Sequence, residues 1–183
     1  MDRNVERSFD ARVYSDGKRM EFLQTSKAAN ILTTREGSGP HHAYDPINKK
    51  CVPVGSSPLK STLLVHFRCY DNHYQLQILG KNDTYLSADY DDILGAFSST
   101  QRDVTHFTLL NADQQPVTLD DLNDPQADIC LQADNAGLIK HSIFKKWGYS
   151  YTCFTHTDGV LKLFNLEILQ RQVVTPDSLE HYD

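Results

Sequence analysis

A degenerate internal repeat constrains the fold of this chain more than any other feature of its sequence. Residues 84–89 read TYLSAD and residues 130–134 read CLQAD. An apolar pair follows each segment, Ile93-Leu94 after the first and Leu138-Ile139 after the second. Self-similar segments of this kind are the signature of a supersecondary unit that a chain uses more than once. The repeat therefore favours folds that contain several copies of one small unit.

Each copy of the repeat ends in a short Phe-x-Leu segment with strand character. Residues 107–109 read FTL and residues 164–166 read FNL. A third and more degraded copy starts at Ile31-Leu32 and ends at residues 66–69. Aromatic and β-branched residues favour strands, so the repeated unit is expected to be all-β. Three such units predict a pseudo-threefold architecture and give no indication of an active site.

Alternating apolar residues between turn signals support an all-β fold. Tyr74, Leu76 and Ile78 fall on one face of an extended segment, because successive side chains of a strand point to opposite faces. Further strand-like runs follow at a spacing of about 8–12 residues, with turn residues between them. This spacing is typical of a β-sandwich or a β-barrel.

Turn residues suggest how the strands are connected. The sequence Ser15-Asp16-Gly17-Lys18 predicts a hairpin between Val13-Tyr14 and residues 19–23. Thr157-Asp158-Gly159 predicts a second tight hairpin turn. Residues 40–60 contain four of the seven prolines and few apolar residues, so the longest loop-like insertion is expected there.

The length of 183 residues fits one domain. We expect an N-terminal strand or arm at 1–19, a single domain at 20–170, and a polar C-terminal tail at 171–183. The tail is acidic and lacks apolar periodicity, which is typical of an unordered terminus.

The order of these segments resembles the fascin-type repeat of the β-trefoil superfamily. That repeat has a Tyr-Leu-Ser-Ala-x strand, a Gly or Asp turn, a short apolar strand and a Phe-x-Leu strand. Residues 85–89 match it most closely, residues 131–138 match it next, and the resemblance covers about residues 20–170. It implies a β-trefoil, with a β-sandwich or jelly roll as the alternative, and it suggests association with actin or the cytoskeleton. The chain lacks the Gln-x-Trp motif that ricin-type lectins usually carry.

The charge of the chain limits its partners. The formal net charge is −6, which argues against nucleic acid, because proteins that track phosphates carry a concentrated basic face. The N-terminal residues are charged and resemble no signal peptide, and no apolar run approaches the length of a membrane span. A cytoplasmic location is expected, and export by a route without a signal peptide stays open.

The candidate catalytic and metal-binding residues do not form a recognised constellation. His41 and His42 are adjacent and would point apart in a strand, which is unfavourable for chelation. Cys153 and His156 are three residues apart, which places them on opposite faces of a strand. We therefore expect no metal, no cofactor and no enzyme activity. The four cysteines sit in apolar stretches and are interpreted as free buried thiols.

The sequence predicts a binding module that recognises carbohydrate, or a protein surface, through its loops. Carboxylates and amides bind sugar hydroxyls and aromatic rings stack on sugar faces, which points to Asp or Asn beside Tyr or Trp. The predicted ligand-binding residues are Asp89, Tyr90, Asp134, Asn135, Trp147 and Tyr149. A fascin-like protein-interaction module and a protease inhibitor that uses loop 38–60 are the alternatives. The sequence leaves the ligand and the oligomeric state open.

Overall fold

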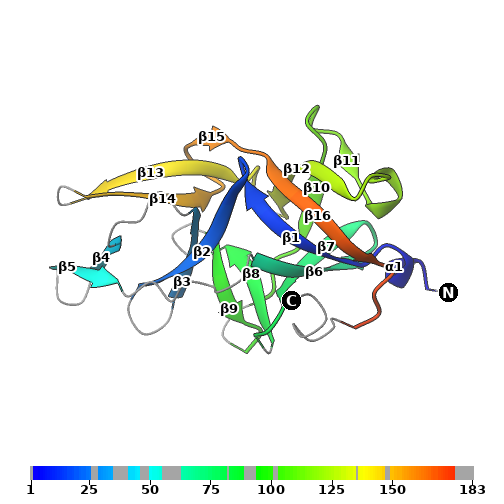
Figure 1. The fold of residues 1–183 in the computed structure, drawn as a ribbon, viewed down its shortest axis with the longest axis horizontal. Coiled ribbons are helices and arrows are strands. Elements are labelled where there is room, and N and C mark those ends of the chain that lie inside the picture. Colours follow the sequence, from blue (N-terminus) through cyan, green and yellow to red (C-terminus); the bar gives the residue numbers. More distant parts are fainter. Residues whose placement is uncertain are drawn as a thin grey trace.

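The structure of the chain is a computed structural model. It describes residues 2–25, 29–34, 41–45, 50–54, 63–81, 83–88, 94–100, 103–134, 136–146 and 149–175. These residues form an all-β fold, as the sequence predicts (Figure 1). The helical elements among them are the short helix α1 (Arg3–Glu6) and the single 3-10 turn η2 (Leu119–Asp121). None of the helices in these ranges has the length and apolar character needed to cross a membrane.

Six antiparallel strands close into a barrel. They are β1 (Phe9–Ser15), β6 (Leu63–Tyr70), β7 (His73–Ile78), β10 (Phe107–Leu110), β12 (Gln126–Ala133) and β16 (Phe164–Arg171). Pairing runs from β1 through β6, β7, β10, β12 and β16 and returns to β1. Closure leaves these strands without an exposed pairing edge, so the barrel is a rigid scaffold.

The other strands lie outside this circuit. Three antiparallel hairpins pair β2 (Lys18–Thr25) with β3 (Ala29–Thr34), β8 (Thr84–Ala88) with β9 (Leu94–Ser98), and β13 (Lys140–Lys146) with β14 (Tyr149–Thr155). A fourth pairs β4 (His41–Asp45) with β5 (Lys50–Val54), while β11 (Pro116–Val117) pairs with β10 and β15 (Val160–Leu161) with β13. Strand β3 pairs with β9 and β14 lies against both, so the first three hairpins meet. Figure 1 shows β13–β14 and β4–β5 extending to the left of the barrel.

The barrel confirms one part of the repeat and corrects another. Phe107 and Phe164 are buried at corresponding places in β10 and β16, but the residue of β6 that shares their register is Val65, two residues before Phe67. The TYLSAD and CLQAD segments, in contrast, are not equivalent. Residues 84–88 form hairpin strand β8, whereas residues 130–133 belong to barrel strand β12. The likeness of these segments reflects a shared strand pattern, which carries no information about the pairing partner.

Aromatic rings from adjacent strands fill part of the barrel interior. Phe9 and Phe67 are paired across β1 and β6, and their rings stack at 4.5 Å between centroids. The ring of Tyr74 meets Phe9 edge-on at 5.9 Å. The Tyr74 hydroxyl accepts a hydrogen bond of 3.1 Å from the backbone N–H of Leu119, which attaches the 3-10 turn to the barrel. The alternation of side chains along these strands thus places the three rings in the core and brings the Tyr74 hydroxyl to the 3-10 turn.

The barrel extends beyond the predicted domain limits. Strand β1 pairs with β16 and β6, so the barrel begins ahead of the predicted start at residue 20. After β16, the backbone N–H of Val173 donates a hydrogen bond of 3.1 Å to the carbonyl oxygen of Ser8, and the Val173 side chain is buried. The segment predicted as tail therefore starts in contact with the barrel.

The predicted hairpin between β1 and β2 is confirmed. Ser15 pairs with Lys18, which leaves Asp16 and Gly17 as the two turn residues. Both have positive φ angles, 49° and 69°. A type I′ turn requires positive φ at both central positions, and Asp-Gly is a favoured sequence there. Local turn chemistry thus determines this connection.

Two other predicted connections are corrected. The Pro-rich region 40–60 was expected to be a loop, but its residues 41–45 and 50–54 pair as β4 and β5. Thr157-Asp158-Gly159 does not close a hairpin, because β15 pairs with β13 and not with β14. The turn instead passes over the end of β13, where a Cβ atom on Gly159 would lie 2.6 Å from the carbonyl oxygen of His141. Glycine is required by this close backbone approach.

Candidate functional site

Most of the predicted ligand-binding residues lie outside the part of the chain that the structure describes. This applies to Asp89, Tyr90, Asn135 and Trp147. Tyr149 begins β14, but its side chain is also outside the described part. Their grouping into one loop site therefore stays a prediction. Asp134 is the exception.

Asp134 follows β12 and belongs to a hydrogen-bonded network on the barrel surface. Its Oδ1 atom lies 3.2 Å from Nδ1 of His73 on β7. The hydroxyl of Thr108 lies 3.2 Å from the same ring nitrogen. A catalytic relay needs the carboxylate on one ring nitrogen and the nucleophile on the other. This network lacks that geometry, because both contacts are made at Nδ1.

The two histidines that precede Phe67 and Phe107 occupy different positions in the barrel, because His66 lies within β6 and His106 lies just before β10. His66 on β6 lies opposite Asp10 on β1, with 2.6 Å between Nδ1 and Oδ1, and both side chains are fully buried. His106 before β10 lies 3.0 Å from the side-chain amide of Gln75 on β7. Each histidine thus binds a side chain of the neighbouring barrel strand. Among the described residues, no group of His, Cys, Asp and Glu is arranged to hold a metal ion.

The described cysteines are buried and unpaired, as predicted for Cys69, Cys130 and Cys153. Burial raises the pKa of all three thiols, and raises that of Cys153 to about 12. The thiolate is the reactive form of cysteine, so these environments suppress nucleophilicity near neutral pH. The side chain of Cys51 lies outside the described part.

We expect these three thiols to resist modification in the folded protein. In a Cys51→Ser background, a thiol-specific disulfide reagent at about pH 8 should label no cysteine of the native protein, because burial keeps the thiols protonated and inaccessible. The same reagent should label all three in guanidinium chloride. Rapid labelling of one equivalent in the native state would contradict the buried arrangement.

A concave surface formed by described residues lies on the outer wall of the barrel. It is a hollow of about 510 Å³ over β12, β16 and β1, closed at one end by the β1–β2 turn. Figure 1 shows β16 running between the other two strands. The lining residues are Tyr14, Gly17, Gln126, Ala127, Asp128, Asn165, Leu166 and Glu167. Volumes of this order are typical of small-molecule sites.

Strand register explains why polar side chains meet in this hollow. Asn165 on β16 lies opposite Asp128 on β12 and opposite Tyr14 on β1. Glu167, two residues further along β16, lies opposite Gln126 and opposite Arg12. Residues two apart share a face of the strand, so the two rows project together from the outer wall. The intervening residues of β1 and β16 face the core.

Asn165 is held in one orientation. Its Oδ1 atom accepts a hydrogen bond of 2.8 Å from the backbone N–H of Gly17. Its Nδ2 atom donates a hydrogen bond of 2.7 Å to Oδ1 of Asp128. The type I′ turn thus fixes the amide, and the amide fixes the carboxylate. Asp128 is an exposed residue, and its other carboxylate oxygen makes no hydrogen bond to a described residue.

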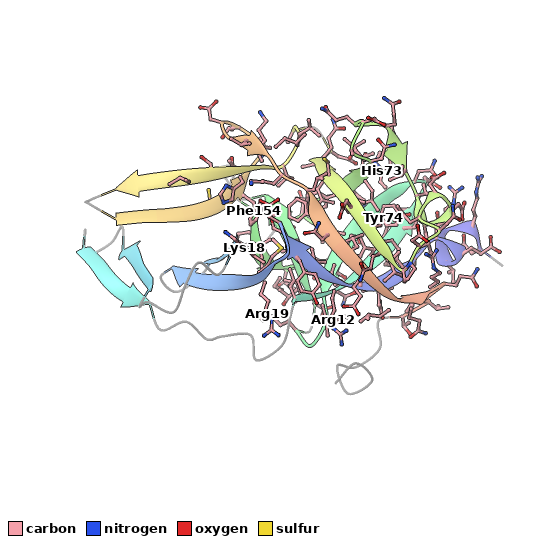
Figure 2. All side chains as sticks on the ribbon, turned by 45° about the horizontal axis from the view of Figure 1, so that its top comes forward. Arg12, Lys18, Arg19, His73, Tyr74 and Phe154 are labelled. Atoms are coloured by element: carbon pink, nitrogen blue, oxygen red, sulfur yellow. The ribbon has the colours of Figure 1, made fainter. Side chains whose placement is uncertain are left out.

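Glu167 is held from the side by two residues of β1. The guanidinium of Arg12 donates to its two oxygens at 3.2 and 3.3 Å. The hydroxyl of Tyr14 donates to Oε2 at 3.4 Å. A carboxylate oxygen can accept two hydrogen bonds, so Oε1 of Glu167, which accepts one from Arg12, keeps acceptor capacity. In Figure 2, Arg12 lies at the lower side of the barrel and His73 at the upper side, so this wall is separate from the Asp134 network.

The sequence predictions missed this site because its residues come from three distant segments. The available signal was the alternation of residues 126–129 and 164–167, which places polar side chains on one face of two strands. That pattern is also typical of an ordinary solvated strand. It acquires meaning only when the register brings Tyr14 and the β1–β2 turn alongside.

Comparisons of the chain with protein-family models, with curated proteins and with solved structures give no match. The interpretation of the hollow therefore depends on its own geometry. That geometry combines a tyrosine, two carboxylates and two amides on a rigid wall.

Proposed function

We propose that the chain is a single β-trefoil. A six-stranded barrel and three meeting hairpins support this assignment. The corresponding register of Val65, Phe107 and Phe164 with their two neighbouring strands supports the pseudo-threefold relation between its units. The β4–β5 hairpin is then an insertion in the first unit, between strand β3 of its hairpin and its closing strand β6.

We propose that the protein is a non-enzymatic module that binds carbohydrate, and that the hollow over β12, β16 and β1 is its binding site. The observation that carries this proposal is the grouping of Tyr14 with Asp128, Asn165 and Glu167 around one concavity. Aromatic rings pack on the apolar face of a sugar, while carboxylates and amides bind its hydroxyls. The site thus moves from the predicted loops to the barrel wall, and the ligand class stays as predicted.

A glycan array with matched variants tests this proposal. The Tyr14→Ala variant should lose at least about tenfold in affinity, equivalent to roughly 1.4 kcal/mol, because it removes the ring and a hydrogen bond to Glu167. Gln132→Ala changes an exposed residue of β12 outside the hollow and should bind like the parent protein. Titration calorimetry on each array hit gives the affinities, and far-UV circular dichroism confirms folding.

The same array separates the barrel wall from the predicted loop site. Loss of binding in Trp147→Ala with retention in Tyr14→Ala would place the ligand on the loops and overturn the assignment of the hollow. An array on which the well-folded parent protein binds nothing would count against carbohydrate altogether. The protein-interaction module would then be the better proposal, tested by actin co-sedimentation.

A further inference from the structure

We propose that the hollow over β12, β16 and β1 accepts sugar units without acidic groups and discriminates against uronates and sulfated sugars. This inference rests on the proposed function and narrows it to a ligand class. It follows from the charges that line the hollow and from the way in which each is held.

The residues that line the hollow offer hydrogen-bond acceptors that carry negative charge. Asp128 offers one oxygen that no described residue binds, and Glu167 keeps acceptor capacity beyond its contacts with Arg12 and Tyr14. The side-chain amide of Gln126 is exposed at the end of the second row and can donate or accept. Sugar hydroxyls can donate to both carboxylates, whereas a ligand carboxylate or sulfate has no proton to donate.

No basic residue is among the residues that line the hollow. Arg12 borders it but donates to both oxygens of Glu167, so its charge is directed at that carboxylate. Arg19 lies opposite Tyr14 on β2, on the far side of the tyrosine from the two carboxylates. An anionic group placed in the hollow would therefore meet Asp128 with no lining cation to offset its charge, and Glu167 with Arg12 already paired to it.

The rigidity of the site strengthens this discrimination. Asp128 is oriented by Asn165, and Asn165 is oriented by the backbone N–H of Gly17. The carboxylate can turn away from an anion only by giving up the hydrogen bond to Asn165. A fixed carboxylate attracts ligand groups that donate a hydrogen bond and repels ligand groups that carry negative charge. Because it cannot turn away, the same charge produces both the affinity and the discrimination.

The test uses matched pairs of sugars that differ in one group. Methyl glucoside, methyl galactoside and methyl mannoside are each titrated beside the uronate that carries a carboxylate at C6. We expect at least one neutral glycoside to bind, and its uronate to bind at least about tenfold more weakly. In Asp128→Asn the preference for the neutral sugar should shrink several-fold. Asp134→Asn makes the same chemical change on the other wall and should leave the preference intact.

The outcomes separate this inference from the proposed function. A uronate that binds as tightly as its neutral partner, or more tightly, would overturn the inference and leave carbohydrate binding standing. An unchanged preference in folded Asp128→Asn would also overturn it. Absence of binding by all six probes, with circular dichroism showing a folded protein, would count against the proposed function itself.

Discussion

Replacing Asp10 with alanine is expected to lower the free energy of unfolding by about 3–5 kcal/mol, because it leaves His66 buried without its partner. The two side chains are fully buried, and 2.6 Å separates Oδ1 of Asp10 from Nδ1 of His66. The other ring nitrogen of His66 has no hydrogen-bond partner among the described residues. Asp10 is therefore the described group that satisfies this histidine.

A double-mutant cycle isolates the pair. Urea denaturation of Asp10→Ala, of His66→Ala and of the double variant should give a smaller loss for the double variant than the sum of the single losses. Gln75→Ala is the control, because Gln75 also contacts a histidine, with 3.0 Å between its Nε2 atom and Nε2 of His106, but this contact is only partly buried. It should cost about 1 kcal/mol. Strictly additive losses in the cycle would show that the two buried groups are independent.

The sequence predicted those parts of the fold that local chemistry determines. The Asp16-Gly17 turn was predicted because two consecutive positive φ angles leave few residue choices. The strands at the two Phe-x-Leu segments were predicted because aromatic and apolar residues favour extended structure there. The mistaken equivalence of residues 84–88 and 130–133 arose because the same alternation is compatible with a hairpin strand and with a barrel strand.

The candidate site could not be predicted from local sequence patterns, for a related reason. Asp and aromatic residues near turns were favoured because turns are exposed, and that preference led to Asp89 and Trp147. The hollow is instead assembled by barrel closure, which brings Tyr14 next to Asn165. Register between segments so far apart depends on the packing of the whole core, and no short motif encodes it. Asp134, the one predicted contact whose side chain is described, belongs to the other wall.

Truncating Phe67 to alanine is expected to lower the free energy of unfolding by about 3–5 kcal/mol. The ring is 1% exposed and lies between Phe9, with which it stacks at 4.5 Å, and Tyr74, whose ring centroid is 6.4 Å away. Barrel closure fixes all three strands, so the neighbouring rings cannot collapse into the space. The cost therefore includes a cavity as well as the lost burial of the ring.

Two control variants make the Phe67 measurement decisive. Phe67→Leu keeps most of the apolar volume and should cost about 1–1.5 kcal/mol, so it stays measurable if the alanine variant is too unstable to purify. Arg68→Ala changes the next residue, which is exposed on the opposite face of β6 and contacts Tyr70, and should cost less than about 1 kcal/mol. If Phe67→Ala lowers the free energy of unfolding by less than Arg68→Ala does, the side chains inside the barrel can repack around the missing ring. The pairing of β1 with β6, which places Phe9 opposite Phe67, would then allow the neighbouring side chains to move more than a closed barrel should.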